Sequence, residues 1–152
     1  MKKLLQHLKE KGLTLGSVES MTGGMFASAF TSVGGSSKVF KGSIVSYAVE
    51  VKNKVVGVSL ETVEKFGVVS EEVAREMATN GQKVLNVDVC VSVTGNAGPT
   101  VEPGGKPVGC FYVGVATKNE VFVECFQKVG SRNKVRNKAV LAMRDFVYSK
   151  TI

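Results

Sequence analysis

The chain has 152 residues, of which 43% are hydrophobic, and a single domain of this size can bury a core without disulfides or metal ions. A formal net charge of +7 at pH 7 gives the surface an average attraction for anions, which suits a phosphorylated substrate, a nucleic acid or an acidic partner. The composition excludes a disulfide-rich scaffold, because the three cysteines are odd in number and lie in apolar, strand-like runs. We expect free, buried thiols at Cys90, Cys110 and Cys125.

The first expected element is an amphipathic helix over residues 2–11, which ends at Gly12. Leu4, Leu5 and Leu8 share its apolar face, and His7, the only histidine, is expected on its surface. The N-terminus lacks the apolar run of a signal peptide, and no later segment has the length of a membrane span. We therefore expect a cytoplasmic protein.

Strands and helices alternate through the middle of the chain. The strands are expected at 13–18, 39–47 and 87–94, and the helices at 22–33, 50–56, 60–66 and 71–85. Ser70 is positioned as the N-cap of the last helix. Its expected buried face consists of Val73, Met77, Val84 and Leu85. The strand at 87–94 is almost entirely apolar and β-branched, which is typical of a sheet centre covered on both sides.

The last part of the chain predicts a loop, a hairpin and a helix. All three prolines fall within 95–107, which indicates the loop. Strands at 109–116 and 120–126 form the expected hairpin. The final helix is expected at 132–147, with one apolar face formed by Val135, Ala139, Met143, Phe146 and Val147. Together these elements predict one domain over residues 1–152, an α/β fold built as a three-layer α/β/α sandwich with a mixed, mainly parallel sheet.

The residues that the chain lacks restrict its chemistry. With one histidine in a terminal helix, we do not expect a Ser-His-Asp or Cys-His arrangement. The cysteines are scattered without C-x-x-C spacing and there is no second histidine, so a zinc site is poorly supplied. Asp88 and Asp145 are the only aspartates, so a carboxylate metal cage would have to come mainly from glutamates. If the chain is an enzyme, its base is expected to be lysine, tyrosine or glutamate.

Ser20 is a candidate nucleophile, because it lies where a strand ends and Gly23-Gly24 opens the next helix. Ligands of open α/β sheets gather at the carboxyl ends of strands, where helix N-termini offer free N–H groups. The alternative is that Ser20 only caps the helix, since the segment lacks the G-x-S-x-G elbow.

Lys52 is a candidate base at the end of the next strand. A lysine accepts a proton only when neutral, so its pKa must be lowered by burial or by neighbouring cations. The alternative is a solvated lysine on an exposed helix face beside Lys54, and Tyr47 is then a plain strand-end aromatic.

The loop from Thr94 to Pro99 and the start of the last helix form a third candidate region. Arg132, Lys134 and Arg136 crowd the first turns of that helix and oppose its dipole, which favours an anion there. A solvated basic face and a nucleic-acid patch are alternatives, although no aromatic residues are interleaved as stacking with single strands requires.

Five segments in this order and spacing resemble the C-terminal domain of the competence/damage-inducible protein CinA. They are Glu19-Ser20-Met21-Thr22-Gly23-Gly24, Tyr47-Ala48-Val49-Glu50-Val51-Lys52, Gly67-Val68-Val69-Ser70, Thr94-Gly95-Asn96-Ala97-Gly98-Pro99 and Lys106-Pro107-Val108-Gly109. Stand-alone members of this family are nicotinamide mononucleotide amidases. The resemblance therefore implies hydrolysis of the carboxamide of nicotinamide mononucleotide, without metal or cofactor.

The same resemblance implies roles for individual residues. Ser20 is expected as the nucleophile, Lys52 as its general base and Tyr47 as a residue that assists the pair. Backbone amides near Thr22 to Gly24, or in the loop from Thr94 to Gly98, are expected to bind the oxyanion and phosphate, and Arg132 the phosphate charge. The expected substrate-binding residues are Thr22, Gly23, Gly24, Ser37, Thr94, Gly95, Asn96, Ala97, Gly98 and Arg132.

Some residues depart from the family pattern. Met21 stands where cysteine or leucine is frequent, Asn96 where the residue is usually apolar, and Val49 where several relatives have asparagine or threonine. Asn96 lies in the expected ligand loop and is a candidate for altered substrate preference.

Partners follow from the same comparison. The expected partners are a phosphorylated pyridine nucleotide and further copies of the chain in a dimer-based homo-oligomer, with no membrane and no nucleic acid. A catalytically silent module that binds nucleotides or proteins is the main alternative. Non-specific nucleic-acid binding driven by the +7 charge is a third hypothesis.

Overall fold

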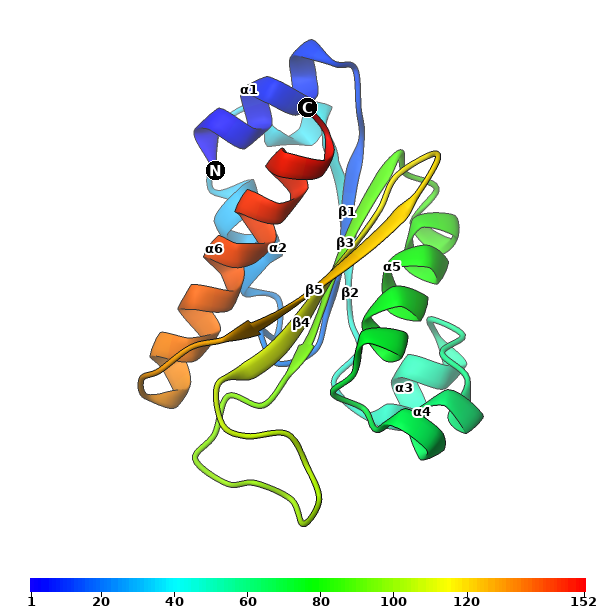
Figure 1. The fold of residues 1–152 in the computed structure, drawn as a ribbon. Coiled ribbons are helices and arrows are strands. Elements are labelled where there is room, and N and C mark those ends of the chain that lie inside the picture. The colour runs from blue at the N-terminus through cyan, green and yellow to red at the C-terminus, as the bar shows by residue number, and fades with distance from the viewer.

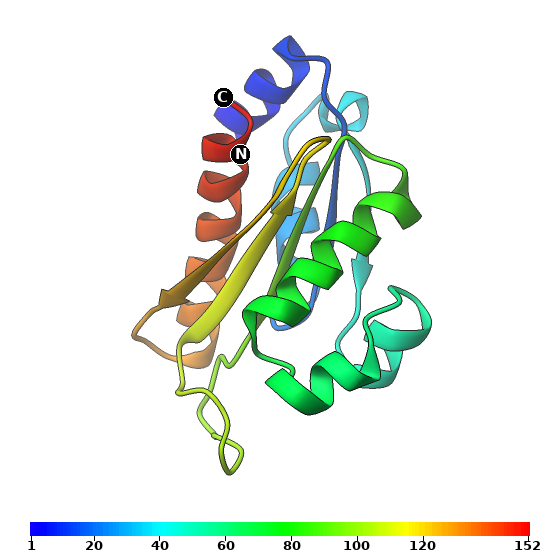
Figure 2. The same cartoon turned by 45° about the vertical axis from the view of Figure 1, so that its right-hand side comes forward.

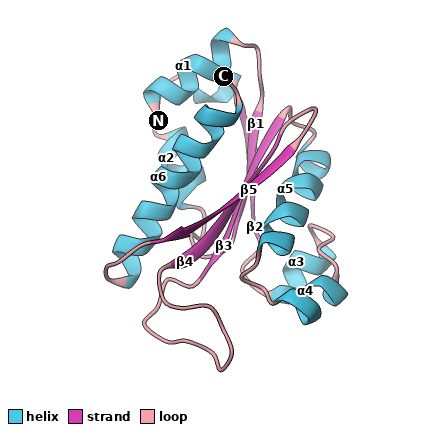
Figure 3. Ribbon diagram, in the orientation of Figure 1, coloured by secondary structure: helices cyan, strands magenta, loops and turns pink.

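The computed structural model describes residues 1–152 and has a five-stranded sheet between two layers of helices (Figures 1 and 3). The strands are β1 (Leu15–Glu19), β2 (Phe40–Val45), β3 (Val89–Gly95), β4 (Cys110–Ala116) and β5 (Val121–Gln127). The helices are α1 (Lys2–Glu10), α2 (Met25–Thr31), α3 (Val49–Lys54), α4 (Leu60–Phe66), α5 (Glu71–Leu85) and α6 (Arg132–Lys150), with a short 3₁₀ helix η1 at Ser36–Lys38.

The sheet has the order β2-β1-β3-β4-β5. β1 pairs in parallel with both β2 and β3, whereas β4 pairs antiparallel with both β3 and β5. The expected mixed sheet is confirmed, with two parallel and two antiparallel pairings in place of a parallel majority. The antiparallel pairings arise because β4 and β5 form the hairpin that the sequence predicts.

Helices cover both faces of the sheet, as the sandwich prediction requires. α1, α2 and α6 lie on one face and α3, α4 and α5 on the other, which Figure 2 shows from a second direction. The larger core lies between the sheet and the first group, where Phe26, Phe30 and Phe111 are fully buried. The residues expected on the inner faces of α1 and α6 are all buried.

The start of α2 differs from the prediction. The helix begins at Met25 and not at residue 22, because Gly23 and Gly24 have positive φ values of 56° and 99°. Left-handed backbone of this kind suits glycine and cannot belong to a right-handed helix. The residues before α2 therefore form a tight turn after β1.

Three side chains are placed differently from their prediction. Val84 is 56% exposed and does not belong to the buried face of α5, whereas Val73 and Met77 do. Cys125 is exposed on the edge strand β5, although all three cysteines are free as expected. His7 is half-buried, because its Nε2 lies 3.0 Å from Thr151 Oγ1 at the other end of the chain.

None of the helices combines the length and the apolar character that crossing a membrane requires.

Candidate active site

Ser20 lies in the turn that joins β1 to α2, directly after the carboxyl end of β1. Its backbone N–H donates to Val93 of β3 (3.2 Å), and its carbonyl accepts from the N–H of Gly23 (3.0 Å). In the sheet, β1 lies between β2 and β3. The chain passes from β1 to β2 on one side of β1 and later to β3 on its other side, so Ser20 lies where the strand order reverses direction. Open α/β sheets bind their ligands at this place. The side chain is nearly buried, with 8% of the residue exposed.

Glu19 fixes the shape of this turn through hydrogen bonds of its side chain. Its buried carboxylate accepts hydrogen bonds from the Thr22 hydroxyl (2.7 Å) and from the backbone N–H groups of Phe26 (2.9 Å) and Ala27 (3.1 Å) at the start of α2. It also accepts from the hydroxyl of Ser43 on β2 (3.1 Å). A carboxylate at a helix N-terminus is stabilised by the helix dipole and satisfies N–H groups that lack partners within the helix.

Lys52 projects from α3 toward Ser20 and is almost fully buried. Its Nζ lies 2.9 Å from Ser20 Oγ and donates to the carbonyl oxygens of Ser46 (2.5 Å) and Tyr47 (3.0 Å) at the end of β2. No carboxylate pairs with it, since the ion pairs of the chain are Arg75–Glu71 and Arg144–Asp145. Burial without a counter-charge lowers the pKa of Lys52 from 10.5 to about 8.

Nζ has three hydrogen-bond partners, and in the protonated amine its three N–H groups donate to Ser20 Oγ and to the two carbonyl oxygens. When the amine is neutral, its two N–H groups can stay on the carbonyl oxygens, which can only accept. The lone pair then faces Ser20, whose hydroxyl can donate to it. The arrangement is a serine with an adjacent proton acceptor, as nucleophilic catalysis requires.

Tyr47 and Arg132 lie together at the mouth of the site. The Tyr47 hydroxyl accepts from Arg132 Nη2 (3.1 Å), while Arg132 Nη1 donates to the carbonyl of Gly98 (2.5 Å). Tyr47 is 63% exposed, and it contacts Lys52 through its backbone carbonyl, not through its hydroxyl. Arg132 thus ties the first turn of α6 to both the end of β2 and the loop after β3.

A cavity of about 220 Å³ opens beside the Ser20–Lys52 pair. Eight of the expected site residues line it: Ser20, Tyr47, Lys52, Thr94, Gly95, Asn96, Ala97 and Arg132. Four apolar residues that sequence reasoning did not assign complete the wall: Met21, Val49, Val68 and Val69. Apolar walls with a few convergent polar groups are typical of small-molecule sites.

The loop after β3 offers backbone groups to the cavity, because its polar side chains are bonded within the protein. The Thr94 hydroxyl donates to the carbonyl of Val68 (2.8 Å), and the Asn96 side chain accepts from Gly98 N–H (3.0 Å) and donates to the carbonyl of Lys106 (3.1 Å). Asn96 therefore braces its own loop, which gives this departure from the family pattern a structural role. The N–H groups of Met21 and Ala97 have no acceptor within the protein, and both residues line the cavity.

The remaining expected binding residues do not line this cavity. The hydroxyl of Thr22 is bound to Glu19, and Gly23 and Gly24 shape the turn behind Ser20. Gly98 contributes its carbonyl to Arg132. Ser37 is exposed in η1 before the amino end of β2, at the opposite end of the sheet from Ser20.

A second hollow of about 350 Å³ adjoins the first, and both are lined by Val68, Val69, Gly95 and Asn96. Its outer wall comes from Phe66 and from the proline-rich loop, including Lys106. The site therefore has room beyond the cavity beside Ser20.

Arg136 is a site residue whose role the sequence did not reveal. Its Nε donates to the carbonyl of Met21 (2.9 Å) and its Nη2 to the carbonyl of Thr22 (3.3 Å). Sequence reasoning included it in a basic cluster suited to an anion, whereas its guanidinium holds the backbone beside Ser20. The signal was its spacing of one helical turn from Arg132, which places both on one face of α6.

The chain brings together no group of three or more His, Cys, Asp or Glu side chains that could hold a metal ion.

A family model described as the CinA C-terminal domain matches residues 1–150. A putative competence-damage inducible protein from Thermoanaerobacter sp. (strain X514) is 48% identical over 145 residues, which are 95% of this chain and 34% of that protein. A CinA-like protein from Flavobacterium psychrophilum is 45% identical over 145 residues, again 95% of this chain and 35% of the relative. The chain spans about a third of the length of the curated relatives it matches.

Solved structures share the fold. A competence-damaged protein (CinA) superfamily protein from Escherichia coli superposes with a TM-score of 0.93 at 29% identity, covering 96% of this chain and 85% of that one. A competence or damage-inducible protein from Enterobacter asburiae gives a TM-score of 0.96 at 27% identity, covering 99% and 95% of the two chains.

Proposed function

Since the chain belongs to the CinA C-terminal domain family, we propose that it is an amidase that hydrolyses nicotinamide mononucleotide to nicotinate mononucleotide and ammonia. The observation that carries the proposal is the distance of 2.9 Å between Lys52 Nζ and Ser20 Oγ in a nearly buried site. The resemblance of the chain to stand-alone amidases supplies the substrate.

Lys52 acts as the general base in this mechanism. Its pKa of about 8 leaves a usable neutral fraction near neutral pH, and its N–H groups are directed to Ser46 and Tyr47. Lys52 takes the proton of Ser20, and Oγ attacks the carboxamide carbon. The protonated lysine then gives this proton to the amide nitrogen, so ammonia leaves and an acyl-enzyme remains.

Water then hydrolyses the acyl-enzyme, with Lys52 again as the proton carrier. Lys52 takes a proton from water, the hydroxide attacks the acyl carbon, and Ser20 Oγ leaves with the proton returned by Lys52. One water is consumed, and one ammonia and one nicotinate product are released. No redox partner is needed.

Two kinds of group stabilise the charges in this scheme. The N–H groups of Met21 and Ala97 lack protein acceptors, and we assign them to the oxyanion that develops on the carboxamide oxygen. Arg132 is exposed at the mouth of the cavity and supplies positive charge for the substrate phosphate. Val68 and Val69 offer an apolar wall to the pyridine ring.

Ammonia and nicotinate mononucleotide release from nicotinamide mononucleotide tests the proposal, with chelator present. Ser20→Ala and Lys52→Ala should each lower turnover by about a thousandfold or more. Lys54→Ala is the matched control, because Lys54 is an exposed lysine on the same helix. Full turnover in Ser20→Ala would remove the mechanism.

The same experiment separates the proposal from a silent binding module. The curated relatives are about three times as long as this chain, so in those proteins the domain is accompanied by other segments. If the folded wild type binds the nucleotide by calorimetry and releases no ammonia, the binding module is correct.

A further inference from the structure

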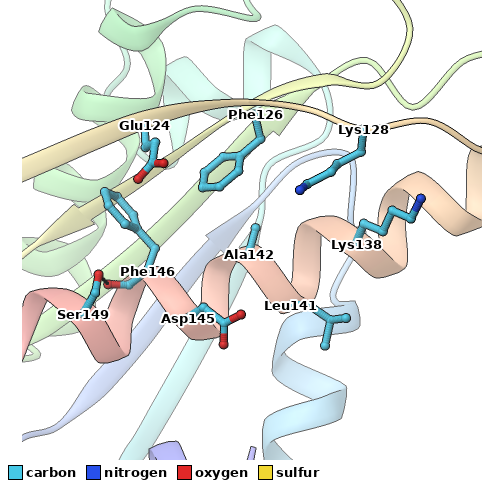
Figure 4. A pocket seen from close by; sticks show the side chains of 9 residues that line it. All are labelled: Glu124, Phe126, Lys128, Lys138, Leu141, Ala142, Asp145, Phe146 and Ser149. Atoms are coloured by element: carbon cyan, nitrogen blue, oxygen red, sulfur yellow. Dashed lines mark hydrogen bonds between the residues drawn. The ribbon is translucent and has the colours of Figure 1, made fainter.

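The β4–β5 hairpin carries two of the three cysteines on one face, next to the loop that lines the Ser20 cavity. Figure 4 shows the other face, where the even-numbered side chains of β5 point toward α6 across a groove of about 550 Å³. Because side chains alternate along a strand, Cys125 points away from this groove, to the face that α5 covers. Cys110 of β4 shares that face, since its register partner is Gln127.

The two thiols of this face are in contact, and they differ in exposure. Cys110 Sγ lies 4.0 Å from Cys125 Sγ. Cys110 is 5% exposed at the start of β4, whereas Cys125 is exposed on the edge strand. Burial raises the pKa of the Cys110 thiol to about 11, and the thiol form is a poor nucleophile. An oxidant in solution therefore meets Cys125 first.

Cys110 is also bonded to the loop after β3. Its carbonyl accepts from the N–H of Asn96 (2.9 Å), and its own N–H donates to the carbonyl of Pro107 (3.1 Å). Asn96 lines both the cavity beside Ser20 and the adjoining hollow. The carbonyl of Cys110 packs against Gly95 as well, because a Cβ on that glycine would meet it at 2.9 Å. A displacement of Cys110 is therefore transmitted to the loop that lines the site.

We propose that Cys110 and Cys125 are a modification site, which hydrogen peroxide converts to a reversible disulfide that displaces the loop carrying Asn96. The peroxide first transfers one oxygen atom to the sulfur of Cys125, which becomes a sulfenic acid, and its other oxygen leaves as water. The sulfur of Cys110 then attacks the sulfur of Cys125, and the sulfenic hydroxyl leaves as water with the thiol proton of Cys110. Two electrons pass from the thiols to one peroxide.

The register of the hairpin makes this bond reversible. Cys110 pairs with Gln127 and Cys125 with Tyr112, so the two cysteines are diagonal neighbours on adjacent strands. Diagonal Cα atoms are about 7–8 Å apart, whereas a relaxed disulfide spans about 4.4–6.8 Å between Cα atoms. The bond forms only if the backbone moves, and a disulfide held in this way is easily reduced. Cys110 is the end that moves, because it is the first residue of β4 while Cys125 lies within β5.

The ordinary explanation of a buried cysteine is that it packs as a small apolar residue. This explanation accounts for Cys90, which is fully buried on the central strand β3. It does not account for Cys125, which is exposed on an edge strand and in contact with a second thiol.

Mass spectrometry of the reduced protein after treatment with hydrogen peroxide tests the proposal. Non-reducing peptide mapping should find one cross-link between Cys110 and Cys125. Hydrogen exchange at the amide of Asn96 should become about fivefold faster or more, because its acceptor is the displaced carbonyl of Cys110. Dithiothreitol should reverse both changes, whereas it does not restore a methionine that has become a sulfoxide.

Three serine variants serve as controls. Cys110→Ser and Cys125→Ser should form no cross-link and keep the exchange of Asn96 unaltered after peroxide. Cys90→Ser removes the third thiol and should respond as wild type does. If Cys110→Ser does not fold, Cys125→Ser still decides the question, because its side chain is exposed.

Each outcome decides the proposal. Free thiols that persist after peroxide, a sulfinic acid on Cys125 or a cross-link between two chains would overturn the modification site. A cross-link between Cys110 and Cys125 that leaves the exchange of Asn96 unaltered would refute the coupling to the loop. None of these readouts needs turnover, so an inactive wild type would remove the amidase proposal without touching this one.

Discussion

Arg136 on the last helix holds the carbonyl oxygen of Met21 at 2.9 Å, although the two residues are 115 positions apart in the chain. Met21 directly follows Ser20, so this contact and the one to Thr22 hold the backbone beside Ser20 from the α6 side, while Glu19 holds the same turn through the hydroxyl of Thr22.

Arg136→Gln should lower kcat about tenfold or more with little change in KM. The variant loses the two guanidinium N–H donors that orient the turn. In the proposed mechanism, a small displacement of Ser20 lowers the rate of attack strongly. Steady-state kinetics with nicotinamide mononucleotide measure the split. Lys134→Gln, an exposed cation on the same helix, should behave as wild type, and equal losses in both variants would show that the effect is only loss of surface charge.

The pH dependence of kcat/KM should follow Lys52. In the proposed mechanism the neutral form is the base, and burial lowers the pKa of Lys52 to about 8, so activity should rise with pH and level off above an apparent pKa near 8. Initial rates between pH 6 and 10 measure this. A rise that continues toward pH 10.5 would mean that the lysine titrates as an ordinary exposed one.

Lys52 should also make stability depend on pH. Its folded pKa of about 8 lies below the 10.5 of the unfolded chain, so between these values the unfolded state binds more protons and the free energy of unfolding rises with pH. Below pH 8 Lys52 is charged in both the folded and the unfolded state, so the stability gained from the neutral buried lysine is absent. Relative to Lys52→Met, wild type should gain on the order of 2 kcal/mol between pH 7 and 10. Urea titrations of both proteins test this, and parallel pH profiles would contradict it.

Gly95→Ala should destabilise the protein by about 1–3 kcal/mol. A Cβ at Gly95 would meet Met21 Sδ at 2.5 Å and the Cys110 carbonyl at 2.9 Å. Thermal or urea unfolding measures the loss. Gly34→Ala is the matched control, because nothing lies within 4 Å of a Cβ there, and it should be near neutral.

Glu19→Gln should cost on the order of 1–3 kcal/mol, because the amide nitrogen cannot accept from the hydroxyl and N–H donors around the carboxylate. At least one buried donor at the start of α2 is left unpaired. Unfolding free energies of wild type and variant measure the effect. The exposed Glu64→Gln should change little, and an equally small change at Glu19 would show that the turn relaxes to satisfy its donors.

Local signals predicted the regular elements well. Ser70 accepts from the N–H of Val73 as an N-cap does, and α5 runs from Glu71 to Leu85 as expected. Residue type alone did not reveal that Gly23 and Gly24 adopt positive φ, so the start of α2 was placed too early.

The site was predicted in part. The contact of Ser20 with Lys52 follows from two strand ends that meet at one edge of a parallel sheet. Sequence gives the type of a side chain, but not the direction in which a particular hydroxyl donates. Thr22 was therefore expected at the substrate, whereas its hydroxyl is committed to Glu19. The sequence shows Arg136 only as part of a basic cluster. Its hydrogen-bond partners are backbone carbonyl groups of a turn that lies far away in the sequence.

The tie between α6 and the turn at Ser20 has a consequence for synthesis. A chain emerging from the ribosome carries Ser20 and Lys52 long before residues 132–136 appear, so the contacts from Arg132 and Arg136 can form only after α6 has been made and has docked. If the domain is the proposed amidase, its activity should therefore depend on the docking of α6, and a chain truncated before Arg132 would lack both contacts.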